Sequence, residues 1–192
     1  MAEKVKFGLK NVHYAPITYG ENGAITYGTP VKWPGAVSIS LDPQGDLTDF
    51  YADDGIYYSG AVNVGYKGTF ESALVPQSFK RDILGDVIDG DTGMLVEKSD
   101  AIAKHFALLF EISGDAKARR VVLFDCSANR AAVGSSTKTN STAPITETLN
   151  LTAVPTADGL VKGQTTDLTN DATYNSWYNA VVVPDLNPVI TT

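Results

Sequence analysis

The alternation of apolar and polar residues is the feature that most constrains the fold of this chain. Residues 37–42 (VSISLD), 62–71 (VNVGYKGTFE) and 145–153 (ITETLNLTA) place an apolar residue at nearly every second position, and the N-terminal VKFGL (5–9) does the same. Successive side chains of a β-strand point to opposite faces of its sheet, so this pattern indicates strands with one buried and one solvated face. The sequence therefore predicts a mainly β protein.

Two further segments are more continuously apolar. KHFALLFEI (104–112) and RRVVLFDC (119–126) predict strands, and the Ser113-Gly114-Asp115 turn between them predicts a hairpin. The 192 residues show no internal repeat and no break in composition, which favours a single domain over 1–192.

One segment, PQSFKRDILG (76–85), predicts a short flanking α-helix. Pro76 suits the helix start, Phe79 and Ile83 share one face, and Gly85 can end the helix in the left-handed conformation. Residues 97–105 (EKSDAIAKH) fit a short helix or a loop equally well.

Two segments are expected to be irregular. Residues 42–55 (DPQGDLTDFYADDG) contain Pro43 and Gly45, five Asp and no Lys or Arg, which predicts a long acidic loop between strands. From about 160 to 192 the composition predicts an irregular C-terminal arm.

Composition narrows the class of protein. With 22 acidic and 15 basic residues the formal charge is −7, the opposite of what a nucleic-acid binder needs to neutralise phosphates. Cys126 is the single cysteine, so no intramolecular disulfide forms, as suits assembly in a reducing cytoplasm. MAEKVKFGLK lacks the apolar core of a secretion signal, and no apolar run reaches the ~20 residues that span a membrane.

Residues that could carry chemistry are sparse. Nucleophilic catalysis needs a base beside the nucleophile, and only His13 and His105 are available. A surface or structural role fits both histidines better, and Cys126 reads as a small buried hydrophobe. The Asp89-Gly90-Asp91 turn resembles a calcium loop but lacks the later bidentate Glu, so whether it binds a cation stays open.

The paired acids Asp53 and Asp54 fit a solvated loop better than an acid/base pair, because adjacent residues do not converge on one pocket. We therefore expect no catalytic residues, no metal site and no cofactor, and hence no enzymatic activity.

An ordered set of segments resembles the major tail proteins (tail tube proteins) of long, non-contractile-tailed phages, the phi13/TP901-1-type family. The segments are KVKFGLKNVHYAPIT, YADDGIYY, NVGYKGTFESALVPQSFKRDILG, KHFALLFEISGDAKARRVVLFDCSANR and TETLNLTAVPTADG. They cover most of residues 4–160 in a consistent order, whereas the last 30 residues match least.

The resemblance implies a structural virion protein with a β-sandwich or barrel flanked by a helix. Six copies would form a ring, the rings would stack into the tail tube that conducts DNA on ejection, and strands of all six would complete one ring-wide β-barrel. Implied partners are other copies of the chain, the tape measure protein, the tail terminator and the baseplate or distal tail proteins. Double-stranded DNA would pass without specific binding, and no membrane is involved. The location would be the virion tail, assembled in the host cytoplasm.

Charge and edge arguments agree with this expectation. Six copies at −7 each carry a formal −42 per ring, which keeps the wall from binding DNA phosphates. Closing six copies into a barrel also removes exposed strand edges.

We hypothesise that the 42–55 segment contacts the next ring, with two apolar anchors among its acids. The contact residues would be Asp46, Asp49, Phe50, Tyr51, Asp53 and Asp54. The candidate basic complements are Arg119 and Arg120, or Lys4, Lys6 and Lys10. The strands around 36–41 and 60–71 would line the lumen, with Lys67 and Glu71 on its polar surface.

Other functions remain as alternatives. A carbohydrate- or protein-binding β-sandwich module (adhesin-like) would use Tyr57, Tyr58, Trp177 and Tyr178 as a stacking platform. A hydrolase built on the Asp cluster is a third alternative. The ring protein of bacterial contractile secretion systems is a further reading within the same structural class.

Overall fold

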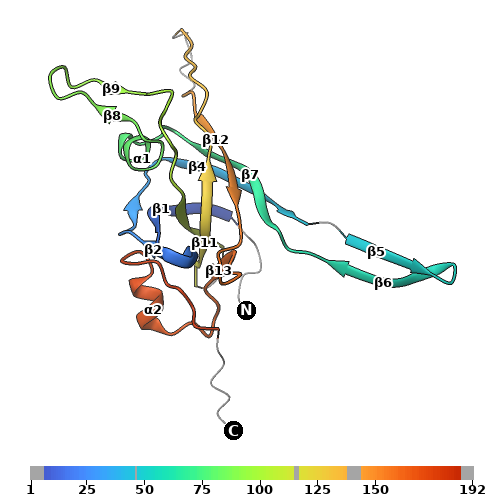
Figure 1. The fold of residues 1–192 in the computed structure, drawn as a ribbon. Coiled ribbons are helices and arrows are strands. Elements are labelled where there is room, and N and C mark those ends of the chain that lie inside the picture. The colour runs from blue at the N-terminus through green and yellow to red at the C-terminus, as the bar shows by residue number, and fades with distance from the viewer. Residues whose placement is uncertain (1–6, 46, 115–116, 138–143, 187–192) are drawn as a thin grey trace.

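The computed structural model describes residues 7–45, 47–114, 117–137 and 144–186. Strands make up 44% of the chain and helices 9%, which confirms the mainly β prediction. A large antiparallel sheet forms the body, one two-stranded hairpin projects far from it, and a second hairpin projects on another side (Figure 1).

The large sheet has the strand order β2-β1-β10-β11-β12-β7-β4, with β3 paired to β1 and β13 paired to β11. Its strands are β1 (Phe7–Tyr19), β2 (Ile25–Tyr27), β3 (Val31–Lys32), β4 (Ala36–Gln44), β7 (Gly65–Ser72), β10 (Phe106–Ser113), β11 (Arg119–Ala128), β12 (Glu147–Ala153) and β13 (Lys162–Gln164). The two hairpins are β5 (Leu47–Ala52) with β6 (Gly55–Ala61), and β8 (Val87–Ile88) with β9 (Leu95–Val96). The helical elements are the 3-10 turn η1 (Glu21–Gly23), α1 (Gln77–Asp82) and α2 (Asp171–Ser176).

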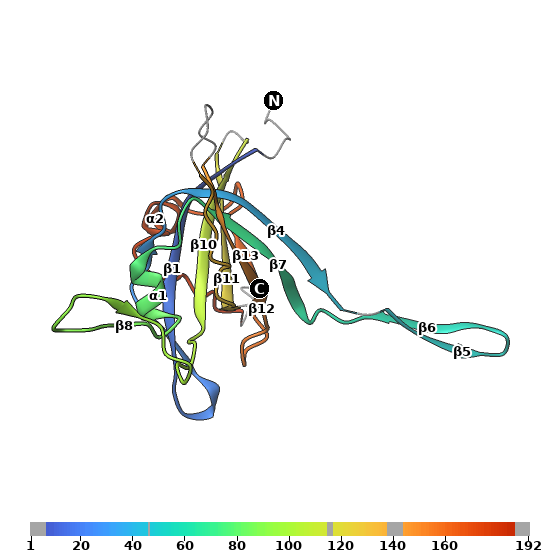
Figure 2. The same cartoon turned by 90° about the horizontal axis from the view of Figure 1, so that it is seen from above.

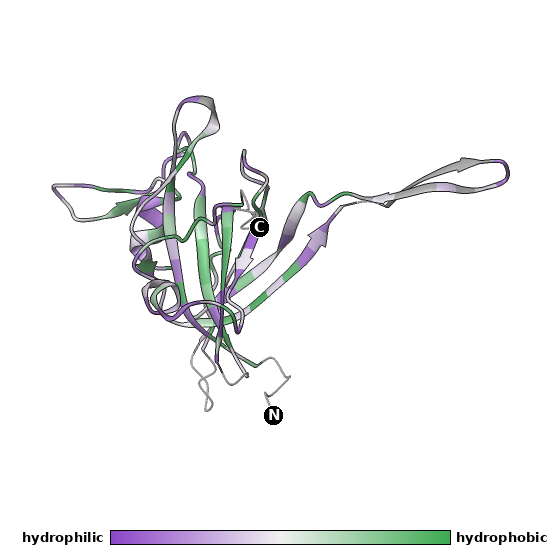
Figure 3. Ribbon diagram, turned by 90° about the horizontal axis from the view of Figure 1, so that it is seen from below, coloured by the Kyte–Doolittle hydropathy of each residue, from purple (hydrophilic) through white to green (hydrophobic). Residues whose placement is uncertain are grey.

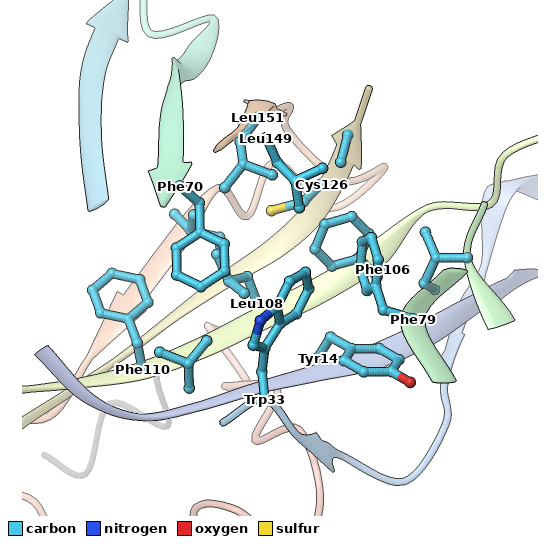
Figure 4. Packing of buried hydrophobic residues seen from close by; sticks show 14 of the residues in the cluster. Tyr14, Trp33, Phe70, Phe79, Phe106, Leu108, Phe110, Cys126, Leu149 and Leu151 are labelled. Carbon is cyan, nitrogen blue, oxygen red and sulfur yellow. The ribbon is translucent and has the colours of Figure 1, made fainter. Parts of the chain in front are cut away.

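The sheet bends so that β4 and β7 curve over the apolar face of β1 and β10 (Figure 2). The first hydrophobic core fills the concave side, and its aromatic centre is shown in Figure 4. Helix α1 closes this core, because the Phe79 ring meets the rings of Tyr14 and Phe106 edge-on at centroid distances of 5.1 and 5.0 Å. The predicted flanking helix at 76–85 is therefore present, and Gly85 has the expected positive φ of 78°.

A second hydrophobic core lies on the opposite face of β10 and β11, under the C-terminal segment. Ala107, Leu109, Val122 and Phe124 pack there against Trp177. Both faces of these strands are thus covered, which explains why their sequences are continuously apolar instead of alternating.

Residues 42–55 are mostly strand, which corrects the prediction of a long loop. Strand β4 runs to Gln44, and β5 pairs with β6 up to the Ala52–Gly55 pair. Asp53 and Asp54 form a tight turn with positive φ of 52° and 61°, the conformation of a two-residue hairpin whose twist matches its strands. The many acids favoured a loop prediction, but the segment and the residues after it also contain Thr, Tyr, Phe and Ile, whose high β propensity favours strands.

The C-terminal arm is more ordered than predicted. It contains β13 and a second short helix, α2, whose first turn is capped by the Asn170 side chain accepting from the Thr173 backbone N–H at 2.8 Å. The sequence predicts no helix in this segment, because its apolar residues are too few for a helical period. Residues 97–105 contain no helix, and 187–192 lie outside the described residues.

Candidate functional site

Strands β4, β7 and β12 present a continuous polar face to solvent. Their register aligns three rows across the strands: Ser38, Glu71 and Thr148; Ser40, Thr69 and Asn150; Asp42, Lys67 and Thr152. Most of these residues are exposed, and Glu71 and Thr152 are partly buried. The face is rich in hydroxyl and amide groups and carries one Lys against two acids.

The other side of the same three strands is apolar. Ile39, Phe70 and Leu149 form one row, Phe70 and Leu149 are each 1% exposed, and the row packs into the first core. The prediction that the strands around 36–41 and 60–71 have one polar and one buried face is confirmed for Ile39 in β4 and Phe70 in β7. It is wrong for Val37, Val62 and Val64, which are exposed, and residues 62–64 lie outside the strands. Lys67 and Glu71 lie on the polar face as expected. That this face lines a lumen stays a prediction.

Glu71 is held in place by two hydroxyl groups, one from β4 and one from Thr146, the residue before β12. Its carboxylate accepts a hydrogen bond from Thr146 Oγ1 at 2.5 Å and another from Ser38 Oγ at 2.9 Å. These bonds favour the ionised form, with the Thr146 contact the larger cause, and lower the pKa of Glu71. The polar face therefore keeps a fixed negative charge at neutral pH.

The β5–β6 hairpin continues the β4–β7 pair and extends well beyond the body (Figures 1 and 3). Between the two pairs the backbones of Gly45 and Val62 approach closely, because a Cβ on Gly45 would lie 1.7 Å from the Val62 carbonyl oxygen. Gly45 also has a φ of 150°, which other residues rarely adopt. The Val64 N–H donates to the Gln44 carbonyl at 2.9 Å across the base. Only glycine permits so close a backbone crossing here.

The hypothesised contact residues are distributed along this hairpin. Asp53 and Asp54 are exposed at its tip. Asp49, Phe50 and Tyr51 belong to β5 by their backbone, and their side chains lie outside the described part of the structure, as does Asp46 entirely. The structure thus joins most of these positions in one projecting element.

One of the proposed basic complements is already engaged within its own subunit. The Arg120 side chain donates to Glu111 at 3.1 Å and stacks over the Tyr174 ring at 3.8 Å, which fastens α2 to β11. It is largely buried, so it is not available to a neighbouring hairpin. Arg119 and Lys10 are exposed, and Lys4 and Lys6 lie outside the described residues.

Sequence reasoning missed a cluster around Asp125, whose side chain is 6% exposed. Its carboxylate lies 2.5 Å from His105 Nδ1 and accepts a 2.7 Å hydrogen bond from the Tyr19 hydroxyl. Burial, followed by this hydrogen bond, raises the pKa of Tyr19. The cluster ties the end of β1 to β11 and to His105, the residue before β10. An acid next to Cys126 near the end of an apolar strand was the available signal of a buried polar group. Its partners could not be found from the sequence, because His105 and Tyr19 are 20 and 106 residues away from Asp125.

The other candidate residues have structural roles. Cys126 is fully buried in the first core, which confirms its reading as a small hydrophobe, and burial raises the pKa of its thiol. His13 stacks on the Tyr178 ring at 4.5 Å and bonds to the Asn11 carbonyl at 2.8 Å. Burial lowers the pKa of His13.

The Asp89 carboxylate accepts from the Thr92 backbone N–H at 3.0 Å and from its hydroxyl, which stabilises the β8–β9 turn and lowers the pKa of Asp89. Among the residues that the structure describes, no group of three or more His, Cys, Asp or Glu side chains is placed to hold a metal ion.

The aromatic platform of the adhesin-like alternative does not assemble. Trp177 is 5% exposed and lies in the second core, and Tyr178 is partly buried against His13 and Arg120. Tyr57 is 75% exposed, but on the projecting hairpin, whereas the Tyr58 side chain is outside the described part.

Comparison with protein-family models finds no match to this sequence. Comparison with curated proteins likewise finds no significant match. In the described part of the chain, neither helix has the length and hydrophobicity required to cross a bilayer.

Proposed function

We propose that this chain is a structural virion protein that self-assembles into stacked six-membered rings forming a phage tail tube. The observation that carries the proposal is the polar β4–β7–β12 face, which ends at an edge strand and extends into a projecting hairpin. A tube protein needs a solvated face for the channel, a free edge for its neighbour in the ring, and a contact along the axis.

The chemistry of the polar face suits a DNA conduit. Its hydroxyl and amide groups are solvated without an array of cations, and one lysine stands against Asp42 and Glu71. Tight binding of DNA requires many Lys or Arg contacts to phosphates, so DNA would slide past this face without being held. The ring-wide barrel would place this face toward the channel.

Strand β4 supplies the edge. It terminates the large sheet, and its nine residues would otherwise offer unpaired backbone groups to any other chain. A neighbouring subunit that pairs along β4 satisfies these groups, and repeating the same head-to-tail contact six times closes a ring. The hairpin would then reach the next ring, and the tape measure, terminator and baseplate proteins would set the tube length and its ends.

Excision of the hairpin tests the proposal. Deleting residues 46–62 joins Gly45 to Asn63, and leaves Gln44-Gly45-Asn63-Val64 closed by the existing bond from Val64 N–H to the Gln44 carbonyl. Gly-Asn is a favoured two-residue hairpin turn, so the body should fold unchanged. We expect the full chain to form rings or tubes by size exclusion and negative-stain electron microscopy, and the deletion variant to fail to form tubes.

A matched control replaces residues 89–94 of the β8–β9 hairpin with Asn-Gly, which shortens the other projection and should leave tubes intact. A full chain that stays monomeric at high concentration and binds glycans would refute the proposal in favour of the adhesin-like alternative. Tubes of normal length from the deletion variant would refute the role of the hairpin.

A further inference from the structure

The large sheet divides at β11, and the division leaves an apolar cleft. Strand β11 pairs with β13 through Val121–Leu123 and with β12 through Cys126–Ala128. The strands β12, β7 and β4 therefore diverge from β10, β11 and β13 (Figure 1). A cleft of about 280 Å³ lies between the two groups of strands.

Apolar side chains dominate the walls of this cleft. The lining residues are Ile39, Leu41, Tyr66, Phe110, Ile112, Val121, Leu123, Lys162 and Gln164. Seven of the nine are apolar or aromatic, one is a cation and none is an acid. Lys162 Nζ donates to the Tyr66 hydroxyl at 2.9 Å, so its positive charge lies between the two walls.

This surface is incompletely buried in the isolated subunit. Ile39, Leu41 and Ile112 are on the core-facing side of their strands, yet each remains partly exposed. Each Å² of apolar surface left in water costs about 25 cal/mol, so an occupant that covers these side chains would bind favourably.

We propose that the cleft receives an aromatic side chain of the β5–β6 hairpin from a second copy of the chain. The inference rests on the proposed function and assigns the receiving surface of its contact. The hairpin continues strands β4 and β7, which form one wall of the cleft. It extends beyond the end of that wall, away from the body of the subunit (Figures 2 and 3). It therefore reaches the cleft of another subunit and not its own.

Charge complementarity supports this occupant. Residues 42–61 carry five Asp and no Lys or Arg. The cleft offers Lys162, and Arg119 lies on the same face of β11 as Val121, beyond the end of the cleft. Opposite charges around an apolar contact steer association and fix its register.

The size of the cleft also fits. At about 280 Å³ the cleft has room for an aromatic side chain but not for a whole hairpin. The hairpin carries Phe50, Tyr51, Tyr57 and Tyr58, and aromatic side chains are the usual anchors of protein interfaces. Because the donor and acceptor surfaces differ, the contact is head-to-tail and propagates from copy to copy.

Cysteine cross-linking tests the contact in the full chain. Cys126 is fully buried and does not contribute to cross-linking. The variants Y57C and I112C are purified separately, mixed under assembly conditions and oxidised. We expect a disulfide-linked dimer in the mixture and not in either variant alone. The matched control is I88C, an exposed isoleucine of the β8–β9 hairpin, mixed with Y57C.

A charge swap gives a second readout. K162E should raise the protein concentration needed for assembly about tenfold without lowering the melting temperature of the subunit, and D53K should restore part of the loss. Normal assembly without a Y57C–I112C cross-link would overturn the inference and leave the proposed function standing. A cross-link of I112C to A2C would assign the cleft to the N-terminal segment and also overturn it. A chain that never assembles would overturn both.

Discussion

Replacement of Trp177 measures whether the C-terminal segment is part of the folded body. Trp177 is 5% exposed and covers Leu109, Val122 and Phe124 on the outer face of the sheet. Truncating a buried Trp to Ala costs about 3–5 kcal/mol of unfolding free energy, through lost transfer energy and the cavity left behind. For a chain of this size the melting temperature should fall by roughly 6–20 °C.

Trp177→Phe should be much milder. The indole N–H of Trp177 is buried and has no hydrogen-bond partner among the described residues, so Phe removes an unsatisfied donor while it keeps most of the apolar contact. We expect the cost of W177F to stay below about 1.5 kcal/mol.

Urea unfolding followed by fluorescence of the remaining Trp33, with circular dichroism as a second probe, measures both variants. Y57A serves as the control, since Tyr57 is 75% exposed and its loss should change stability by less than about 0.5 kcal/mol. If W177A costs under about 1 kcal/mol, or as little as W177F, the segment does not cover a second core.

Three further predictions concern the body of the protein. Burial is the main cause that raises the pKa of both Tyr14 and Tyr27 to about 12, whereas the unfolded chain releases these protons near pH 10. The free energy of unfolding should therefore fall between about pH 10 and 12. Melting temperatures that do not change over this pH range would contradict the prediction. D125N replaces the buried carboxylate of the Asp125 cluster and should lower the free energy of unfolding by about 1.5–3 kcal/mol in thermal unfolding. A loss of less than about 0.5 kcal/mol would show that the cluster does not stabilise the fold. G68A should cost about 1–3 kcal/mol, because a Cβ there would meet the Ser40 carbonyl oxygen at 1.9 Å; a variant as stable as the parent would show that β4 moves freely.

The sequence by itself determined the strands and their faces. Alternation is a local property, so residue order alone assigns Ser38, Lys67 and Thr148 to the polar face of their strands, whereas the rows that they form across the sheet depend on strand pairing. The helix over α1 was predictable for the same reason, because its Pro, its apolar face and its glycine stop are close in sequence.

Tertiary structure decided the rest. Local patterns do not specify pairing partners, so the division of β11 between β12 and β13, and the cleft that results, appear only when distant strands meet. The Asp125 cluster has the same origin, since Tyr19 is 106 residues away. The 42–55 segment was misjudged because five acids outweighed its β propensity. In the folded chain only Asp53 and Asp54 form the turn, while the rest extends β4 and builds the hairpin. Pairing with distant strands decides whether a charged segment becomes strand or loop, and the composition of the segment does not reveal that pairing.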